Sequence, residues 1–393
     1  MKSVEEIAKD VKDNGDNAVK KYIKQFDGED LEEFEVTKAE IEEAFKKVDK
    51  KTVEAIKFSI KNVERFAKKQ LKSIKDLKTH IASNILGHKI IPIERVACYI
   101  PGGNYPLLSS AIMTIVPARI AGVEEIYAFS PKIKPETIVS ASLAGATRIF
   151  KFGGVQAISA SAYGTETIRK VNKIVGPGNK YVTSAKKFVF GEVGIDFLAG
   201  PSEVMIIADE SANPEFVAVD MLAQCEHDKD ARAYLVCKSE DFAHKVEEYA
   251  QKELENLKTK DIAKISFGKS FAIIVQSIKD AIDLTNKRAP EHLELCISDA
   301  KKLMNEFKNY GSLFIGNYSA EVFGDYCSGT NHVLPTNQVS KYSGGLSVFD
   351  FIKIQTYQII SKSGNREIAP YASLLANEEG LMAHKLASDK RIK

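Results

Sequence analysis

From residue 90 onward, short apolar runs alternate with turn residues and helical segments, and this pattern constrains the fold more than any other feature. Apolar runs this short are typical of buried strands, and the segments between them have helical periodicity. The alternation predicts parallel sheets whose strands are joined by crossover helices. The first predicted strands are Arg95–Ile100, Glu125–Phe129, Arg148–Phe152, Lys173–Val175 and Val204–Ala208.

A second alternation follows the first. With 393 residues, 44% of them apolar, the chain is long enough for two or three domains. The pattern therefore indicates two α/β units rather than one. Its predicted helices are Pro214–His227, Asp241–Leu257 and Ile278–Arg288, and its predicted strands are Ala233–Cys237, Phe271–Val275 and short runs near Leu293 and Leu313.

The two ends of the chain have a different character. Ser3–Glu6 and Thr37–Glu40 have capping-box spacing ahead of helical patterns, and Val53–Lys75 is a long amphipathic stretch. We therefore expect the first eighty residues to be mostly helical. Residues 349–393 predict a strand followed by helices.

Composition excludes several classes of protein. Fifty-five basic residues against fifty-three acidic ones leave a formal charge of +2, too small a field to indicate binding of nucleic acid or an anionic membrane. The N-terminus lacks the apolar core of a signal peptide, and no stretch approaches the ~20 apolar residues of a membrane span. Five scattered cysteines without a Cys-x-x-Cys pair indicate neither a disulfide framework nor a thiolate zinc cluster. We expect a cytoplasmic enzyme.

A carboxylate and an imidazole stand side by side in residues 286–294, Asn-Lys-Arg-Ala-Pro-Glu-His-Leu-Glu. Glu291 and His292 follow a proline in a strand-like context, and two groups of different pKa suit stepwise proton transfer. Taken alone, such a pair is more often structural.

Two glycine-rich turns follow predicted strands. Tyr99–Gly103 ends one strand with two glycines, which would let the backbone approach a ligand at the carboxyl end of a sheet. Residues 173–181 place Gly176 and Gly178 between a strand and a helix, but Tyr181 stands where a Rossmann fingerprint needs its third glycine. The sequence indicates dinucleotide or phosphate contact only weakly, and plain tight turns remain open.

Metal-ligand candidates are dispersed along the chain. Gln224 and His227 lie three residues apart at the end of a predicted helix and would share a face. They could hold zinc if a carboxylate and another imidazole arrived from elsewhere. Asp325, in the polar glycine-rich segment 324–335, and His384 near the C-terminus are the candidates. Each group alone is more often structural.

Several short blocks keep a definite order along nearly the whole chain. They are Tyr99–Gly103, Gly153–Ala157, Val175–Asn179, Gly200–Glu203, Gln224–His227, Pro290–Leu293, Gly324–Tyr326, Ser328–His332, Gly345–Phe351 and Glu379–His384. In order and spacing they resemble the histidinol dehydrogenase family. The resemblance implies a zinc enzyme that oxidises L-histidinol through histidinaldehyde to L-histidine with two NAD⁺, the last step of histidine biosynthesis.

The resemblance also implies roles for individual residues. The family's zinc ligands, one ion per subunit, match Gln224, His227, Asp325 and His384, and its catalytic pair matches Glu291 and His292. His292 would accept the alcohol proton, and Glu291 would activate water for aldehyde oxidation. The positions that contact substrate match Ser202, His332 and Glu379, together with His292 and the four metal ligands; those that contact the nucleotide match Tyr99, Gln156 and Asn179.

The implied architecture is α/β, with two incomplete Rossmann-like domains flanked by helical ends. We expect an N-terminal helical region at 1–89, an NAD-binding domain at 90–202, a second domain with the zinc and catalytic residues at 203–345, joined by part of the N-terminal region, and a tail at 346–393. The family's tail crosses to the other subunit of a homodimer, so Glu379 and His384 would complete the neighbouring site. Two alternatives remain: a related zinc- and NAD-dependent dehydrogenase of another alcohol, and a non-catalytic zinc-binding relative.

Overall fold

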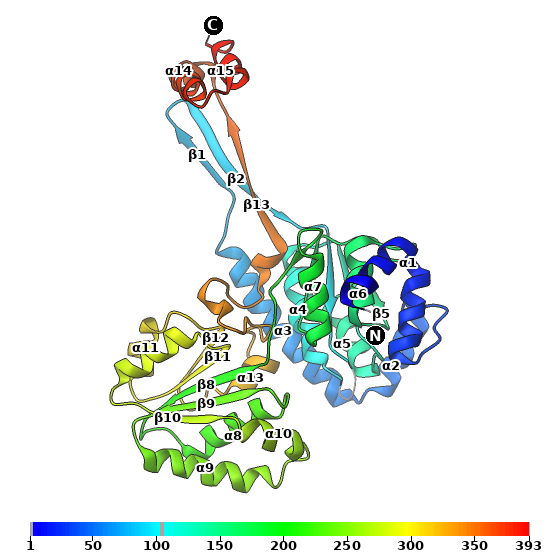
Figure 1. Ribbon diagram of the computed structural model, residues 1–393, viewed down its shortest axis with the longest axis vertical. Helices are drawn as coiled ribbons and strands as arrows, with labels where there is room; N and C mark the ends of the chain where they lie inside the picture. The colour runs from blue at the N-terminus through cyan, green and yellow to red at the C-terminus, as the bar shows by residue number, and fades with distance from the viewer. Residues whose placement is uncertain (1–2, 103–105, 393) are drawn as a thin grey trace. The chain divides into compact units, whose positions relative to one another are not determined.

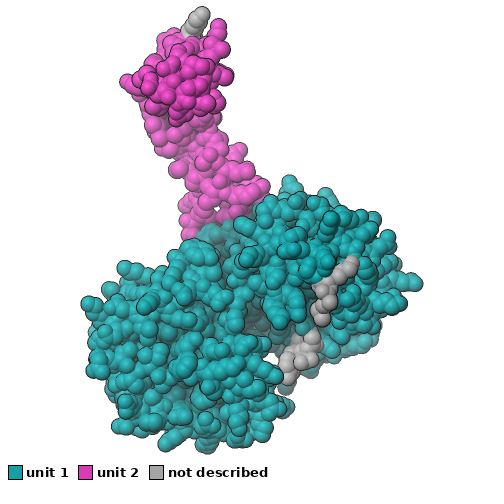
Figure 2. Space-filling model, viewed as in Figure 1, with its two compact units in different colours: residues 1–69, 93–351 teal, residues 70–92, 352–393 magenta. Residues whose placement is uncertain are grey.

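The computed structural model describes residues 3–102 and 106–392 and divides into two compact units. The first unit comprises Met1–Lys69 and Ile93–Phe351, and the second comprises Gln70–Pro92 and Ile352–Lys393 (Figure 1, Figure 2). Gly103 of the first glycine-rich turn lies outside the described residues. None of the helices within the described ranges combines the length and the apolar character that a membrane span needs.

The first unit contains two parallel sheets of five strands each, which confirms the predicted α/β fold. The strands of the first sheet are β3 Arg95–Tyr99, β4 Glu125–Phe129, β5 Arg148–Phe150, β6 Lys173–Val175 and β7 Gly194–Ile195. Their order is β5-β4-β3-β6-β7, so the chain reverses its direction of travel between β3 and β6. Ligands of open parallel sheets bind at such a reversal, beyond the carboxyl ends of the strands.

Helices cover both faces of the first sheet (Figure 1). Alternate strand residues, among them Tyr99, Tyr127 and Phe129, pack with α1, α6 and α7 in one core, because successive strand side chains point to opposite faces. On the other face α4 packs against α5, and α4 is buried along nearly its whole length. The helices are α4 Leu108–Ala121, α5 Pro135–Ala144, α6 Gly154–Tyr163 and α7 Lys180–Val189, and α1 is Val4–Asp27.

The second sheet repeats this plan. Its strands are β8 Glu203–Ala208, β9 Arg232–Cys237, β10 Phe271–Ile274, β11 His292–Cys296 and β12 Ser312–Ile315, in the order β10-β9-β8-β11-β12. Val204 and Ile206 pack towards α8, α9 and α10, whereas Met205 and Ile207 pack towards α11 and α12. These helices are α8 Pro214–Cys225, α9 Glu240–Leu254, α10 Lys260–Phe267, α11 Ile278–Arg288 and α12 Ala300–Leu303, followed by α13 Glu321–Tyr326.

The N-terminal helices form as the capping signals predict. Ser3 and Thr37 both make complete capping boxes, which begin α1 and α2 Lys38–Lys47. The third helix, α3, spans Lys50–Lys72. Short 3₁₀ turns occur at η1 Met304–Glu306, η2 Val339–Lys341 and η3 Val348–Phe351.

The second unit is an antiparallel ribbon that carries two helices (Figure 1). Strands β1 Leu77–Ile81, β2 Asn84–Pro92 and β13 Ile352–Ile359 pair in the order β1-β2-β13, and α14 Lys362–Glu378 packs on α15 Met382–Asp389. The predicted strand and helices of residues 349–393 are confirmed, whereas β1 and β2 were not expected. The predicted domain boundaries at 89, 202 and 345 stay predictions.

Candidate active site

Glu291 and His292 lie where the chain passes from helix α11 into the buried strand β11. Ala289 ends the helix in a left-handed conformation (φ 56°), and Pro290, which cannot extend the helix, leads into the strand. The two residues are only 6% and 4% exposed. The turn therefore delivers an acid and an imidazole to the amino end of β11, inside the protein.

Two donors hold the carboxyl group of Glu291. The Ser202 hydroxyl donates to Glu291 Oε2 at 2.5 Å, and the backbone N–H of Glu203 donates to the same oxygen at 2.9 Å. Burial raises the pKa of Glu291 to about 8, although both hydrogen bonds oppose the rise. A carboxyl group with a pKa in this range can exchange a proton near neutral pH.

Strand pairing determines which nitrogen of His292 carries the proton. Nδ1 lies 3.1 Å from the backbone carbonyl oxygen of Glu203, on the neighbouring strand β8. Because that oxygen can only accept, Nδ1 is the donor and Nε2 presents a lone pair. Nε2 is buried and has no hydrogen-bond partner among the described residues. Burial lowers the pKa of His292 to about 3, so the ring is a neutral base at physiological pH.

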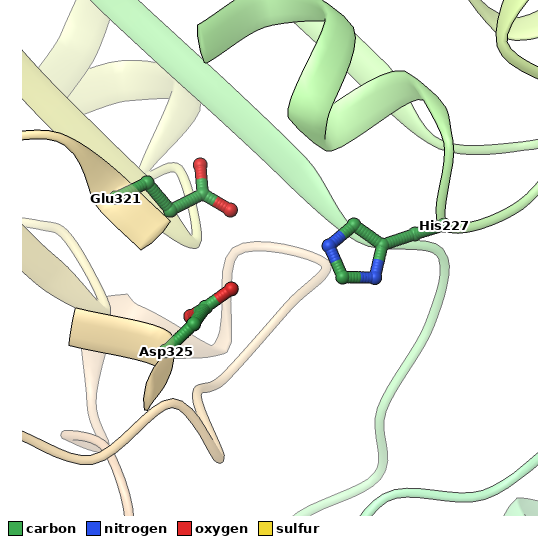
Figure 3. Close-up of side chains that lie close together, drawn as sticks. All are labelled: His227, Glu321 and Asp325. Atoms are coloured by element: carbon green, nitrogen blue, oxygen red, sulfur yellow. The ribbon is translucent and has the colours of Figure 1, made fainter. Parts of the chain in front are cut away.

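A candidate metal centre adjoins this pair. His227, Glu321 and Asp325 bring one ligand atom each to within 4.8 Å of one another, and Figure 3 shows the three side chains converging. Asp325 Oδ1 lies 3.9 Å from His292 Nε2. Burial raises the pKa of Asp325 to about 6 and that of Glu321 well above its usual range. Buried carboxylates need a compensating positive charge, which a cation would supply.

Gln224, a predicted metal ligand, lies at the end of helix α8, three residues before His227. Its side chain is fully buried, yet neither amide atom has a hydrogen-bond partner in the described part of the chain. Helix α8 ends at Cys225, earlier than predicted, so His227 lies just beyond the helix rather than in its last turn. An amide oxygen, an imidazole and carboxylates form the nitrogen and oxygen donor set that zinc accepts. The residues therefore fit a zinc ion.

Glu321 was not expected from the sequence. It begins the short helix α13 and stands four residues before Asp325, so both carboxylates project from one face. Its Oε2 atom is buried without a hydrogen-bond partner among the described residues. The spacing Glu-x-x-x-Asp is the only signal that could have indicated it, and a helix of six residues is too short to show periodicity.

A cavity of about 330 Å³, here called the His292 cavity, gathers most of the predicted substrate contacts. Its wall includes Ser202, His227, Glu291, His292, Asp325 and His332. His332 Nδ1 lies 2.8 Å from the carbonyl oxygen of Asp325, which leaves Nε2 as its free acceptor. Pro101 and Gly178, at the carboxyl ends of the first sheet, line the same cavity, which therefore lies between the two sheets of the first unit.

A second cavity of about 590 Å³, the Tyr99 cavity, contains all three predicted nucleotide contacts, Tyr99, Gln156 and Asn179. The Tyr99 hydroxyl accepts from the backbone N–H of Gly154 at 3.1 Å, and Asn179 caps α7. Gln156 Oε1 is buried without a partner among the described residues. Gly176 (φ +112°) passes so close to Tyr99 that a Cβ atom would lie 2.1 Å from the Tyr99 carbonyl oxygen, so the loop between the cavities requires glycine there.

Two predicted site residues lie in the second unit rather than the first. Glu379 closes α14 and His384 lies in α15, both in the second unit, and both side chains are exposed. Their roles stay predictions.

Comparison with known proteins decides the family. A family model described as histidinol dehydrogenase matches residues 1–392. The chain belongs to the histidinol dehydrogenase family. The histidinol dehydrogenase of Methanocaldococcus jannaschii is 48% identical over 100% of this chain and 92% of its own length, and that of Aquifex aeolicus is 45% identical over 98% and 91%.

The fold agrees with the family. The crystal structure of histidinol dehydrogenase from Elizabethkingia anophelis superposes with a TM-score of 0.96 and 38% identity, and the match covers 99% of this chain and 91% of that one. The resemblance read from the ordered blocks is thus confirmed, as is the α/β architecture.

Proposed function

We propose that this protein is a histidinol dehydrogenase that oxidises L-histidinol, through L-histidinaldehyde, to L-histidine with two NAD⁺. The observation that carries the proposal is the neutral His292, whose tautomer leaves Nε2 free beside Asp325, next to a carboxyl of raised pKa. Oxidation of an alcohol needs a base for the hydroxyl proton and an acceptor for the hydride. Family membership and the Tyr99 cavity support NAD⁺ as that acceptor.

His292 acts on the alcohol. Its Nε2 takes the proton of the substrate hydroxyl while a hydride passes to NAD⁺ from the carbon that bears this hydroxyl. The hydrogen bond from Nδ1–H to the Glu203 carbonyl keeps the ring in place while it becomes charged. Because burial lowers the pKa of the His292 ring, the charged ring readily gives that proton up again.

Glu291 acts on water in the second oxidation. Ser202 and the Glu203 N–H occupy Oε2, which leaves Oε1 to accept a proton from the water that adds to the aldehyde. The hydrated carbon then gives a second hydride to a second NAD⁺, its two hydroxyl protons pass to solvent, and the product is the carboxylate. A cation at the neighbouring donors would lower the pKa of Glu291 and favour the basic form, because positive charge stabilises a carboxylate.

Zinc would be held by Gln224, His227 and Asp325, with His384 as a fourth ligand and Glu321 beside them. When bound, it would supply a Lewis-acidic centre that fixes the amine and imidazole nitrogens of the substrate and so orients the hydroxymethyl carbon. The buried, unpartnered amide of Gln224, the unpartnered Oε2 of Glu321 and the convergence of His227, Glu321 and Asp325 support this assignment.

His384 and Glu379 would complete the site of a second copy in a homodimer. The helices that carry them expose large apolar side chains, including Tyr371, Leu374 and Leu375, and exposed apolar surface of this kind marks protein interfaces. Subunits with Glu291→Gln and with His384→Ala should each be inactive alone. If the tail crosses, mixed dimers contain one intact site, and an equal mixture should recover about a quarter of wild-type activity. No recovery in co-expressed, co-purified mixed dimers would contradict the crossing.

The direct test of the proposed function is NADH formation by zinc-loaded protein with L-histidinol, compared with other primary alcohols. Turnover confined to L-histidinol is the expected result. Turnover with a different alcohol alone would indicate the related dehydrogenase, and zinc and nucleotide binding without any turnover would indicate a non-catalytic relative.

A further inference from the structure

A carboxyl group without a partner lines the Tyr99 cavity. Asp27 is the last residue of α1, and its Oδ2 atom is buried with no hydrogen-bond partner among the described residues. The remaining described residues of the cavity wall are apolar or neutral, so Asp27 is the one charged side chain there. A buried, unsatisfied carboxylate oxygen is unfavourable unless a donor reaches it in another state of the protein.

The position of the cavity indicates which donor that would be. Tyr99 and Asn179 line the Tyr99 cavity, whereas Pro101 and Gly178, their near neighbours in sequence, line the His292 cavity. The two cavities thus flank the same loops at the carboxyl ends of β3 and β6. A dinucleotide with its nicotinamide near His292 would have its adenosine half in the Tyr99 cavity, where the ribose hydroxyls and the adenine amino group are the available hydrogen-bond donors.

Two charged side chains near Asp27, those of Glu29 and Lys132, lie outside the cavity wall. Burial and the nearby Glu29 raise the pKa of Asp27, and Lys132 opposes the rise. Lys132 is exposed and is not part of the cavity wall. Asp27 also faces the phenol of Tyr99, whose pKa burial, chiefly, and this carboxylate raise to about 12, so Tyr99 stays neutral.

We propose that Asp27 accepts a hydrogen bond from the adenosine ribose and makes the site select NAD over NADP. A carboxylate accepts from the 2′-hydroxyl of NAD, whereas the 2′-phosphate of NADP would bring two like charges together in a partly buried cavity. The acceptor comes from the N-terminal helix rather than from the sheet. The inference rests on the proposed function, because it takes NAD as the hydride acceptor.

The test compares Asp27→Asn and Asp27→Ala with wild type, using L-histidinol and either NAD⁺ or NADP⁺. We expect the ratio of kcat/KM for NAD⁺ to that for NADP⁺ to fall about tenfold or more in both variants, since a hydrogen bond to a charged group is lost. Asp27→Ala should raise the KM for NAD⁺ with little change in kcat. Because the ratio does not depend on the folded fraction, partial misfolding leaves it interpretable.

Asp30→Asn is the matched control. Asp30 lies three residues further on, is exposed and pairs with Lys24, and it does not line the cavity. This variant should keep the wild-type ratio. An unchanged ratio in both Asp27 variants of an enzyme that turns over NAD⁺ would overturn the inference and leave the proposed function standing.

Binding measurements without turnover test the role of Asp27 separately from the identity of the substrate. Calorimetric titration with ADP-ribose and with its 2′-phosphate should show that wild type prefers ADP-ribose, and that Asp27→Asn loses the preference. This result is expected even if L-histidinol proves not to be the substrate. Equal binding of both probes to wild type would overturn the inference whatever the substrate.

Discussion

A buried ion pair behind the loop at Gly176 offers a prediction with a calculable magnitude. Lys186 on α7 pairs with Asp196, and their side chains are 4% and 1% exposed. Lys186 Nζ also donates to the Gly176 carbonyl at 3.0 Å, and Asp196 Oδ2 accepts from the Gly176 N–H at 2.8 Å. The pair therefore holds the backbone N–H and the carbonyl of Gly176, the residue on which the loop between the two cavities depends.

Lys186→Met removes the cation and leaves the Asp196 carboxylate buried without its charge partner. Breaking a buried pair in this way costs about 3–5 kcal/mol of folding free energy. Lys186→Met combined with Asp196→Asn leaves no net buried charge, and the asparagine oxygen can still accept from Gly176. The double variant should therefore lose less stability than the sum of the two single variants, by about 1–3 kcal/mol.

The assay is urea denaturation at pH 7 followed by far-UV circular dichroism, because the chain has no tryptophan. Lys187→Met is the control: Lys187 is the next residue on the same helix and is exposed, so its loss should change stability by no more than ~0.5 kcal/mol. A loss below about 1 kcal/mol for Lys186→Met, or strict additivity in the double variant, would refute the reasoning. A folded Lys186→Met enzyme should also have a raised KM for NAD⁺.

Three further predictions concern the acid–base groups. His292→Asn should retain zinc but lower kcat by about 10²–10⁴-fold, whereas Asp325→Asn should lose zinc first; zinc analysis with steady-state rates distinguishes them. Aldehyde oxidation should rise with pH to a plateau, with a midpoint at or below about 8, because Glu291 must be deprotonated, and Glu291→Gln should show no such activity at any pH. Arg95, chiefly, lowers the pKa of Glu125 to about 2, so this carboxylate stabilises the fold above its unfolded pKa of ~4.3 and loses that effect as pH falls towards about 2. Glu125→Gln should flatten this part of an acid denaturation curve; an unchanged curve would contradict the assignment.

The sequence predicts the central strands of the parallel sheets well because these strands are buried on both faces. The runs Glu125–Phe129 and Lys173–Val175 are apolar and buried after a charged first residue, and both form strands with the predicted bounds. The helix Ile278–Arg288 also has the predicted bounds, since Ser277 caps its start and Pro290 follows its end.

The ribbon of the second unit could not be predicted in the same way. β2 pairs with β13 across more than half of the chain, and no local pattern records such a partner. Many of their side chains are exposed or half-buried, so the strands lack the continuous apolar runs that indicate buried ones.

The candidate site also contains residues that a local sequence pattern indicates and residues whose role depends on partners distant in the sequence. Glu291 and His292 are neighbours in sequence, and the residues alone indicated them. Gln224, His227 and Asp325 were candidates by residue type, but only the resemblance joined them into one site, because Asp325 lies about a hundred residues after the other two. Lys186 escaped notice because a lysine on an amphipathic helix is normally exposed, and its burial depends on Asp196, which follows it by ten residues.

The most direct test of the proposed function is the ratio of NADH to L-histidine formed from L-histidinol by zinc-loaded protein, with a chelator arm and zinc restoration. We expect two NADH per L-histidine, loss of activity on chelation and its return with zinc. One NADH per substrate with accumulation of the aldehyde, or full turnover by protein shown to be metal-free, would contradict the proposed four-electron zinc chemistry.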